Sequence, residues 1–141
     1  MFGRKWLARM KKIPVKTLAE VMSAEPELNY EGFNVFGAEL MDAEQRDAEM
    51  VRAREKLKAA QAEIQACLTW LKRIKRTENI NPRHSSNGLK HCVERMSGGY
   101  VSNGALIAAA LMAGFHFERM DDGVNARFNV DEESVNKYSG V

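Results

Sequence analysis

The feature that most constrains the fold is a heptad pattern in the middle of the chain. From residue 50 to residue 74, apolar residues recur with alternating steps of three and four, as along the buried edge of a coiled-coil helix. We call this set the seam; its members are Met50, Ala53, Leu57, Ala60, Ile64, Cys67, Leu71 and Ile74. The pattern predicts one long helix over residues 38–76. Glu39 and Arg46 occupy the upstream seam positions, so we expect this helix to pair along its second half only.

The pattern leaves the partner of the seam open. The N-terminal helix of the same chain and the same helix of a second copy both fit it. Small residues at positions 53, 60 and 67 would let either partner approach closely. The seam therefore predicts helix packing within the chain or a homodimer.

Residues 1–37 form the first of three predicted segments. Residues 2–13 place apolar side chains on one face and bases around the rest, which predicts a basic amphipathic helix that Pro14 ends. Thr17 and Glu20 have the spacing of a capping box and predict a short second helix. Residues 27–37 are rich in glycine and aromatic residues and predict an ordered loop or a short strand. Its anchors are expected to be Tyr30, Phe33 and Phe36.

The long helix occupies the second segment, residues 38–78, and residues 79–141 form a third, compact segment. Ser86 and Ser102 are predicted to begin two short helices, the second of which is apolar on every side and ends at Gly114. Period-two alternation around a turn at residues 121–123 then predicts a β-hairpin. The polar tail from Asp131 is expected either to fray or to add a helical turn over residues 134–138. The fold class is therefore α+β and mostly α, in the order of a winged helix-turn-helix.

Charge is segregated along the chain, although the net charge is only +2. Residues 1–16 carry +6, residues 17–50 carry −8, residues 51–84 carry +6 and residues 85–141 carry −2. The acidic and basic blocks can fold against each other, or they can select a partner. For the second case, the predicted partner-binding face consists of Glu39, Asp42, Glu44, Asp47 and Glu49.

The winged-helix order makes DNA binding the alternative function. The predicted nucleic-acid contacts are bases near the third segment or on the hairpin: Lys72, Arg73, Lys75, Arg76, Arg83, Arg119 and Arg127. A recognition helix must present polar side chains to base edges, but the helix over residues 103–113 offers only Asn103. The bases at 72–76 also suit a solvated helix end, because the helix dipole favours cations there.

Catalysis and metal binding find little support in the sequence. The spacing of His84, His91, Cys67 and Cys92 matches no structural zinc motif. Phosphate-binding glycine loops and a nucleophile elbow are both absent from the sequence. We therefore expect no enzyme activity, no cofactor and no metal. The two cysteines fit buried free thiols in a reducing cytoplasm. No apolar run reaches the ~20 residues of a membrane span.

A resemblance covers residues 83–130. The stretches RHSSNGLKH from residue 83, GYVSNG from residue 99 and IAAALMAGF from residue 107 resemble small proteins of bacterial prophages and mobile elements. The resemblance implies a phage or plasmid gene product that acts in the cytoplasm of a bacterial host. Mobile elements encode proteins of this size that disable host defences, anti-CRISPR proteins among them. The expected function is thus a non-catalytic protein that binds and inhibits or modulates a host protein or nucleoprotein complex.

Overall fold

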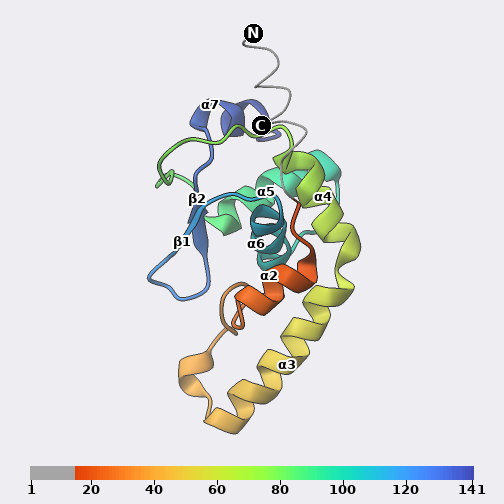
Figure 1. The fold of residues 1–141 in the computed structure, drawn as a ribbon, viewed down its shortest axis with the longest axis vertical. Helices are drawn as coiled ribbons and strands as arrows, with labels where there is room; N and C mark the ends of the chain where they lie inside the picture. The colour runs from red at the N-terminus through yellow and green to blue at the C-terminus, as the bar shows by residue number, and fades with distance from the viewer. Residues whose placement is uncertain (1–14) are drawn as a thin grey trace.

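The computed structural model describes residues 15–141 (Figure 1). The predicted basic helix over residues 2–13 lies outside the described residues. Within residues 15–141, no helix is both long enough and apolar enough to cross a membrane. The described chain is mostly helical and carries one antiparallel hairpin near its C-terminal end. The predicted α+β class is confirmed at this level.

Helix α2 (Leu18–Ala24) begins with the predicted capping box. The Thr17 hydroxyl accepts a hydrogen bond from the Glu20 amide at 3.1 Å, and the Glu20 carboxylate accepts one from the Thr17 amide at 3.4 Å. These two bonds satisfy amides that a helix start otherwise leaves unpaired. Val21 and Met22 face the core, so α2 lies against the body of the protein.

The prediction of one unbroken helix over residues 38–76 is wrong. A short 3₁₀ turn, η1 (Ala38–Leu40), precedes α3 (Ala43–Ala59), and α4 (Gln61–Leu71) follows after a break. The backbone at Ala60 has φ −86° and ψ 43°, outside the helical region, and this bends the chain between the two helices. Asp42 begins α3 because its side chain accepts from the Gln45 amide at 2.8 Å. The apolar period continues across the break, which is why periodicity alone did not show it.

The segment after α4 leaves the helix early and runs beside the C-terminal part of the chain. Arg76 forms an antiparallel bridge with Val130, and the Thr77 amide donates to the Asn129 carbonyl at 2.9 Å. The buried Asn81 side chain donates to the Val130 carbonyl at 3.0 Å. From Arg76 onward the chain thus bonds to the C-terminal part of the protein and no longer continues α4.

Helices α5 (Ser86–Ser97) and α6 (Asn103–Met112) form where the sequence predicts them. The cap of α5 is Ser85, one residue before the predicted Ser86, because the Ser85 hydroxyl accepts from the Gly88 amide at 3.1 Å. The Ser86 hydroxyl instead accepts from the Ala126 amide at 3.0 Å, which ties α5 to the hairpin. Ser102 caps α6 as predicted, and Gly114 follows its end with φ 86°.

The predicted hairpin is present as β1 (Phe117–Arg119) and β2 (Ala126–Phe128). The strands are antiparallel, with Phe117 opposite Phe128. At the turn, the Asp122 carboxylate accepts from the Asn125 amide at 2.9 Å, and Gly123 has φ 77°. The tail does not fray: it forms α7 (Glu132–Lys137), capped by Asp131, where the sequence also allowed a helical turn.

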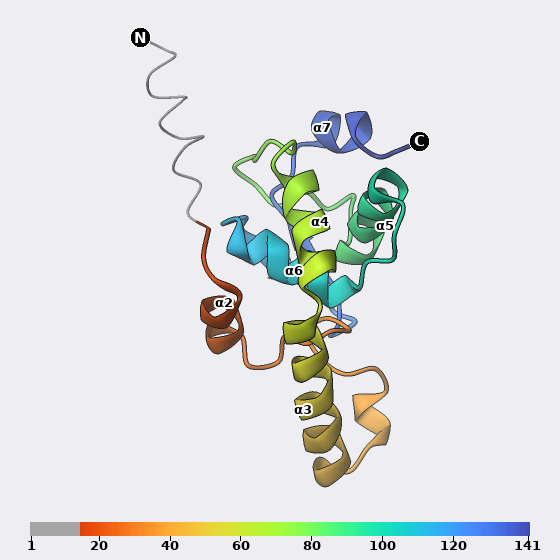
Figure 2. The ribbon, with the colours of Figure 1, turned by 90° about the vertical axis from the view of Figure 1, so that its right-hand side faces the viewer.

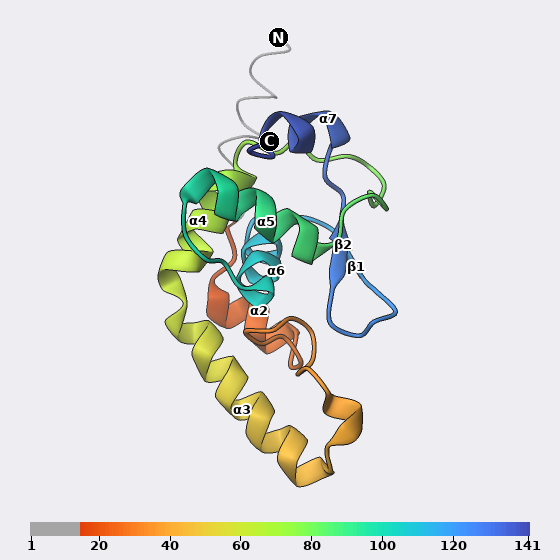
Figure 3. The same cartoon turned by 180° about the vertical axis from the view of Figure 1, so that it is seen from behind.

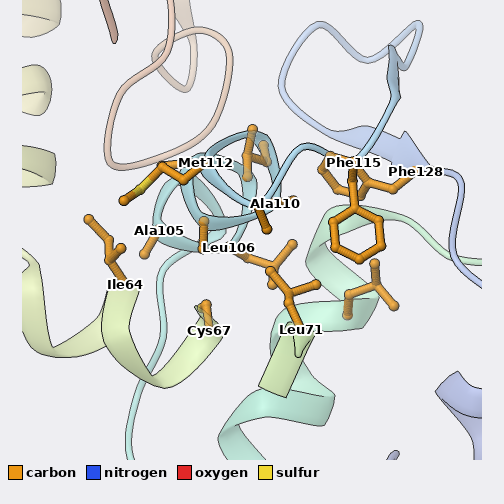
Figure 4. Packing of buried hydrophobic residues seen from close by; sticks show 14 of the residues in the cluster. Ile64, Cys67, Leu71, Ala105, Leu106, Ala110, Met112, Phe115 and Phe128 are labelled. Atoms are coloured by element: carbon orange, nitrogen blue, oxygen red, sulfur yellow. The ribbon is translucent and has the colours of Figure 1, made fainter. Parts of the chain in front are cut away.

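Helix α6 is the centre of the molecule (Figure 2). Residues 103–110 and 112 are all buried, and α2, α4 and α5 pack around them. One cluster of buried apolar residues contains members from residue 21 to residue 135, so the predicted segments share a core. Figure 4 shows Ile64, Cys67 and Leu71 of α4 pointing toward Ala105 and Leu106 of α6. Small alanine side chains let α4 approach α6 closely.

Candidate functional site: an acidic arm and the cleft at its base

Residues 34–50 form an arm that projects from the body (Figures 1 and 3). The arm comprises a loop, η1 and the first half of α3. It has a small core of its own, in which Val35, Ala38 and Ala53 are buried and Met41 and Met50 pack against them. The loop and η1 are therefore fixed to α3, and the arm has a defined surface.

The arm carries the predicted acidic face. Glu39, Asp42, Glu44 and Asp47 are exposed, and Glu49 is half-buried and forms an ion pair with Arg52. Five carboxylates against one base, Arg46, give residues 38–50 a formal charge of −4. The structure thus brings all five predicted acidic residues together on one projection.

Large apolar side chains of the same region are also exposed. Leu40 is 86% exposed, Phe36 is 77% exposed and Val51 is 64% exposed. Of the three predicted anchors of the aromatic loop, Phe36 is exposed and that prediction is wrong, whereas Phe33 is an anchor as predicted. Phe33 is fully buried and stacks on Phe117 with 5.4 Å between the ring centroids.

A cleft of about 480 Å³ lies at the base of the arm. One wall comes from α3, another from α5, and the rest from the loop after α2 and the turn before α6. The cleft combines aromatic rings with cations. The Lys56 ammonium lies 4.4 Å from the centroid of the Tyr30 ring, and the Lys90 ammonium lies 4.7 Å from that of Tyr100. The lining residues are Tyr30, Glu31, Phe36, Glu49, Arg52, Ala53, Lys56, Asn87, Lys90, Tyr100 and Asn103.

Behind the cleft, Glu63 fixes two of its elements. One carboxylate oxygen accepts from the Tyr30 hydroxyl at 2.9 Å, and the other accepts from the Ser102 amide at 2.7 Å. Burial and then the neighbouring Glu63 raise the pKa of Tyr30 to about 12. Tyr30 thus remains a neutral hydrogen-bond donor at alkaline pH values at which an exposed tyrosine would ionise.

Glu94 holds the other wall in a similar way. Its carboxylate accepts from the Lys90 ammonium at 3.3 Å, from the Val101 amide at 3.1 Å and from His91 at 2.7 Å. Burial acts to raise the pKa of Glu94, but these hydrogen bonds outweigh it and lower the pKa below the usual value. Lys90 itself is buried, so Glu94 neutralises a cation that would otherwise be costly inside the protein.

The seam faces the interior of the same chain. Met50 is half-buried, and the other seven residues of the seam are buried in the single chain. Ala53 belongs to the core of the arm, and the α4 residues pack on α6. The helix that meets the α4 part of the seam is thus α6, a partner that the heptad pattern did not indicate. A homodimer through these same residues would require the core to open.

Two of the predicted nucleic-acid contacts, Arg76 and Arg119, are bonded within their own chain. The Arg76 guanidinium donates to the Ala113 carbonyl and lies 4.6 Å from the Phe115 ring centroid. Burial lowers the pKa of Arg76. Arg119 binds Glu27 at 3.0 Å and the Phe33 carbonyl at 3.3 Å. These two arginines thus make contacts within their own chain, and both are also exposed.

The other predicted contacts and the helix in the position of a recognition helix are placed as follows. Lys72, Arg73, Lys75 and Arg83 are exposed, and Arg127 is half-buried. Arg73 also lies 5.6 Å from the Tyr138 ring centroid. Helix α6, which stands in the place of a recognition helix, is enclosed by the core and cannot enter a DNA groove as it lies.

Candidate metal ligands and thiols are engaged elsewhere. His84 contacts Glu132 at 2.7 Å, and His91 contacts Glu94. Cys67 and Cys92 are buried, and burial raises the pKa of both thiols. Among residues 15–141, no group of three or more His, Cys, Asp or Glu side chains is arranged to hold a metal ion.

Sequence reasoning missed the cleft altogether. Its residues come from four separated stretches, 30–36, 49–56, 87–90 and 100–103, and none of these contains a motif. The one available signal was the aromatic loop, whose Tyr30 and Phe36 do line the cleft. Lys56, Lys90 and Tyr100 gain their significance only from the way α3, α5 and α6 meet.

Comparisons with protein-family models, with curated proteins and with solved structures gave no match to this chain. The resemblance of residues 83–130 to prophage and mobile-element proteins therefore stays a prediction that rests on the quoted residues. In the structure these residues form α5, α6 and the hairpin, which build the core. The arm and most of the cleft lie outside them.

Proposed function

We propose that this chain is a non-catalytic protein that docks its acidic arm on a basic surface of a macromolecular complex, and so inhibits or modulates it. The observation that carries the proposal is the placement of the five acidic residues on a projection with its own small core. Such a surface attracts a basic partner over a distance and then fits it without much reordering.

The helix dipole accounts for only part of this acidic cluster. The dipole favours carboxylates in the first turn of a helix and weakens beyond it. Glu44 lies in the first turn of α3, and Asp42 is its cap. Glu39 precedes the helix, and Asp47 lies beyond the first turn, so neither gains much from the dipole. A partner that carries positive charge gives these positions a role.

Exposed apolar side chains support a protein partner. Leu40 and Phe36 lie in the part of the arm that precedes α3, and Val51 lies just beyond residue 50 on α3. Charge complementarity mainly sets the rate and specificity of association, whereas buried apolar anchors supply much of the affinity. An arm with both kinds of residue suits a protein or nucleoprotein surface.

The resemblance of residues 83–130 leads us to place the protein in a phage or other mobile element of a bacterium. On that basis the partner is a host defence complex, and the action is of the anti-CRISPR kind. A complex of this kind has a basic groove for nucleic acid, and the carboxylates of the arm would occupy it in place of phosphates. The site of action would be the host cytoplasm.

A pulldown with charge-reversed variants tests the proposal. Glu39, Glu44 and Asp47 are the best positions to change to lysine, because no described side chain depends on them. Asp42 and Glu49 are left in place, since they cap α3 and pair with Arg52. The tagged proteins are incubated with bacterial lysate that is treated with nuclease or left untreated.

The matched control is a triple lysine variant of Glu78, Glu118 and Glu133, which are exposed and lie outside the arm. We expect the unchanged protein and the control variant to retain one host complex after nuclease treatment, and the arm variant to lose it. Equal capture by both variants would refute docking through the acidic arm. Capture of nucleic acid alone, lost on nuclease treatment, would favour a DNA-binding regulator.

A further inference from the structure

We propose that the cleft at the base of the arm binds a free nucleotide, with the base against its exposed aromatic rings and the phosphate at Lys56. This second activity does not depend on the proposed function. The cleft volume of about 480 Å³ is within the usual size of small-ligand sites. The assignment rests on three kinds of group that meet there.

The first group consists of aromatic rings. Tyr100 is 66% exposed and Phe36 is 77% exposed, and both line the cleft. Every nucleobase can stack on such a ring, whatever its hydrogen-bonding edge. Exposed rings in the wall of a cleft are available for this contact without any rearrangement of the core.

The second group consists of cations. Arg52 is paired with Glu49, and Lys90 is paired with Glu94. Lys56 also lines the cleft and has no carboxylate partner among residues 15–141; its ammonium lies over the Tyr30 ring. Lys56 is therefore the cation in the cleft that is best placed to bind a phosphate group.

The third group consists of polar side chains without a full set of partners. Asn103 is 9% exposed; its Nδ2 donates to the Glu31 carbonyl at 3.0 Å, while its Oδ1 has no hydrogen-bond partner. The Oδ1 atom itself is buried, so the amino group or ring N–H of a base would reach it only after the Asn103 side chain turned toward the cleft. The Glu31 carboxylate, also in the lining, suits the hydroxyls of a ribose, as acidic side chains do in dinucleotide sites.

The charge of the arm favours a free nucleotide over a strand. Glu49 lines the cleft itself, and the other acidic residues of the arm continue from it. The further phosphates of a strand that left the cleft along the arm would meet these carboxylates, and like charges repel. A single nucleotide places its one phosphate at Lys56 and brings no further phosphates toward the arm.

Titration of the full-length ¹⁵N-labelled protein with the ribonucleoside 5′-monophosphates tests the proposal. We expect the backbone amides of Lys56, Asn87 and Tyr100 to shift on addition of at least one of them. Adenosine, ribose 5-phosphate and inorganic phosphate serve as partial ligands, and a short single-stranded RNA as the polymer. The best monophosphate should bind about tenfold more tightly than any partial ligand, since stacking and phosphate contact each contribute.

Two variants locate the binding. Lys56→Gln and Tyr100→Ala should each weaken binding about tenfold. Both side chains are at the surface, and circular dichroism checks that the fold is kept. Lys58→Gln is the matched control, because Lys58 lies on the same helix but pairs with Glu55 at 3.0 Å outside the cleft. It should bind as the unchanged protein does.

The proposal is overturned if no monophosphate shifts the cleft amides at about 10 mM, a concentration that reveals even weak binding. It is overturned as well if both variants bind as tightly as the Lys58→Gln control. Tighter binding of the RNA than of every monophosphate would replace the free nucleotide by a strand. Equal binding of ribose 5-phosphate would show an anion site without base recognition.

Discussion

Replacement of Arg54 tests most directly how the arm is attached to the body of the protein. The Arg54 guanidinium donates to four backbone carbonyls, those of Met22 at 2.8 Å, Glu25 at 3.0 Å, Pro26 at 2.9 Å and Leu28 at 2.8 Å. Proline at position 26 has no N–H, so the helical bond that the Met22 carbonyl would otherwise accept is missing. Arg54 supplies a donor in its place and closes the C-terminal end of α2.

Replacement of Arg54 by alanine should lower the free energy of unfolding by about 3 kcal/mol. A hydrogen bond from a charged donor contributes about 1.5–3 kcal/mol. The four bonds share one half-buried guanidinium that water solvates in part, so their sum is far smaller than four such values. For a chain of 141 residues, the loss corresponds to a fall of about 10 °C in Tm. Urea denaturation followed by circular dichroism measures it.

Two further variants make the reasoning refutable. Arg52→Ala removes a base from the same helix, but its partner Glu49 is a surface carboxylate, so the expected loss is below about 1 kcal/mol. Arg54→Lys keeps the charge but presents one ammonium instead of a planar fork, and should lose about 2 kcal/mol. A loss for Arg54→Ala no larger than that for Arg52→Ala would refute the role of the four carbonyls.

Three shorter predictions concern other buried groups. Gly104→Ala should prevent stable folding, because the added Cβ would lie 1.9 Å from the Asn29 carbonyl oxygen; thermal denaturation measures this. Tyr30 should ionise at about pH 12 in a spectrophotometric titration. Because the pKa of Tyr30 is higher in the folded state, its contribution to the free energy of unfolding is complete below pH 10.0. This contribution is lost as the pH rises from 10.0 toward 12. Cys67 and Cys92 should resist a thiol reagent until the protein unfolds, because both thiols are buried and their pKa values are raised.

Each of these has a control and a contradicting result. Gly99→Ala places a Cβ in open space and should leave Tm nearly unchanged; equal stability of the Gly104 variant would disprove the close approach. Glu63→Gln should lower the pKa of Tyr30, and an unchanged titration would show that Glu63 has no part in it. Rapid labelling of either cysteine under native conditions would contradict its burial.

Local signals in the sequence predicted their elements well. The capping box at Thr17, the cap at Ser102 and the turn before Gly123 depend on bonds between residues two to four positions apart, and the structure contains them. The alternation around residues 115–130 likewise gave the hairpin, because a two-residue period is the property of a strand with one buried face. These features need little information from the rest of the chain.

Long-range bonds accompany three features that the sequence did not show. Helix α4 ends at Leu71 rather than near residue 76, and Arg76 then pairs with Val130, although no residue of the 72–76 run breaks a helix by itself. Ser86 looks like a cap as much as Ser85 does, but the hairpin takes its hydroxyl. The role of Arg54 was equally hidden, since its partners lie 26–32 residues earlier in the chain.

The same long-range bonds explain how a projecting arm can be rigid. Helix α3 begins in the arm, where Ala53 belongs to the small cluster, and its later turn places Leu57 in the main core. Between these two positions, the Arg54 side chain donates hydrogen bonds to carbonyls at the end of α2. At the first of them, the Ala53 carbonyl accepts a hydrogen bond from the Tyr30 amide at 3.1 Å. Helix α3 is thus packed in both cores, and it connects the acidic residues of the arm directly to the main core. A partner that binds them meets a surface whose ordering is already complete, so less of the binding free energy is lost to fixing the arm.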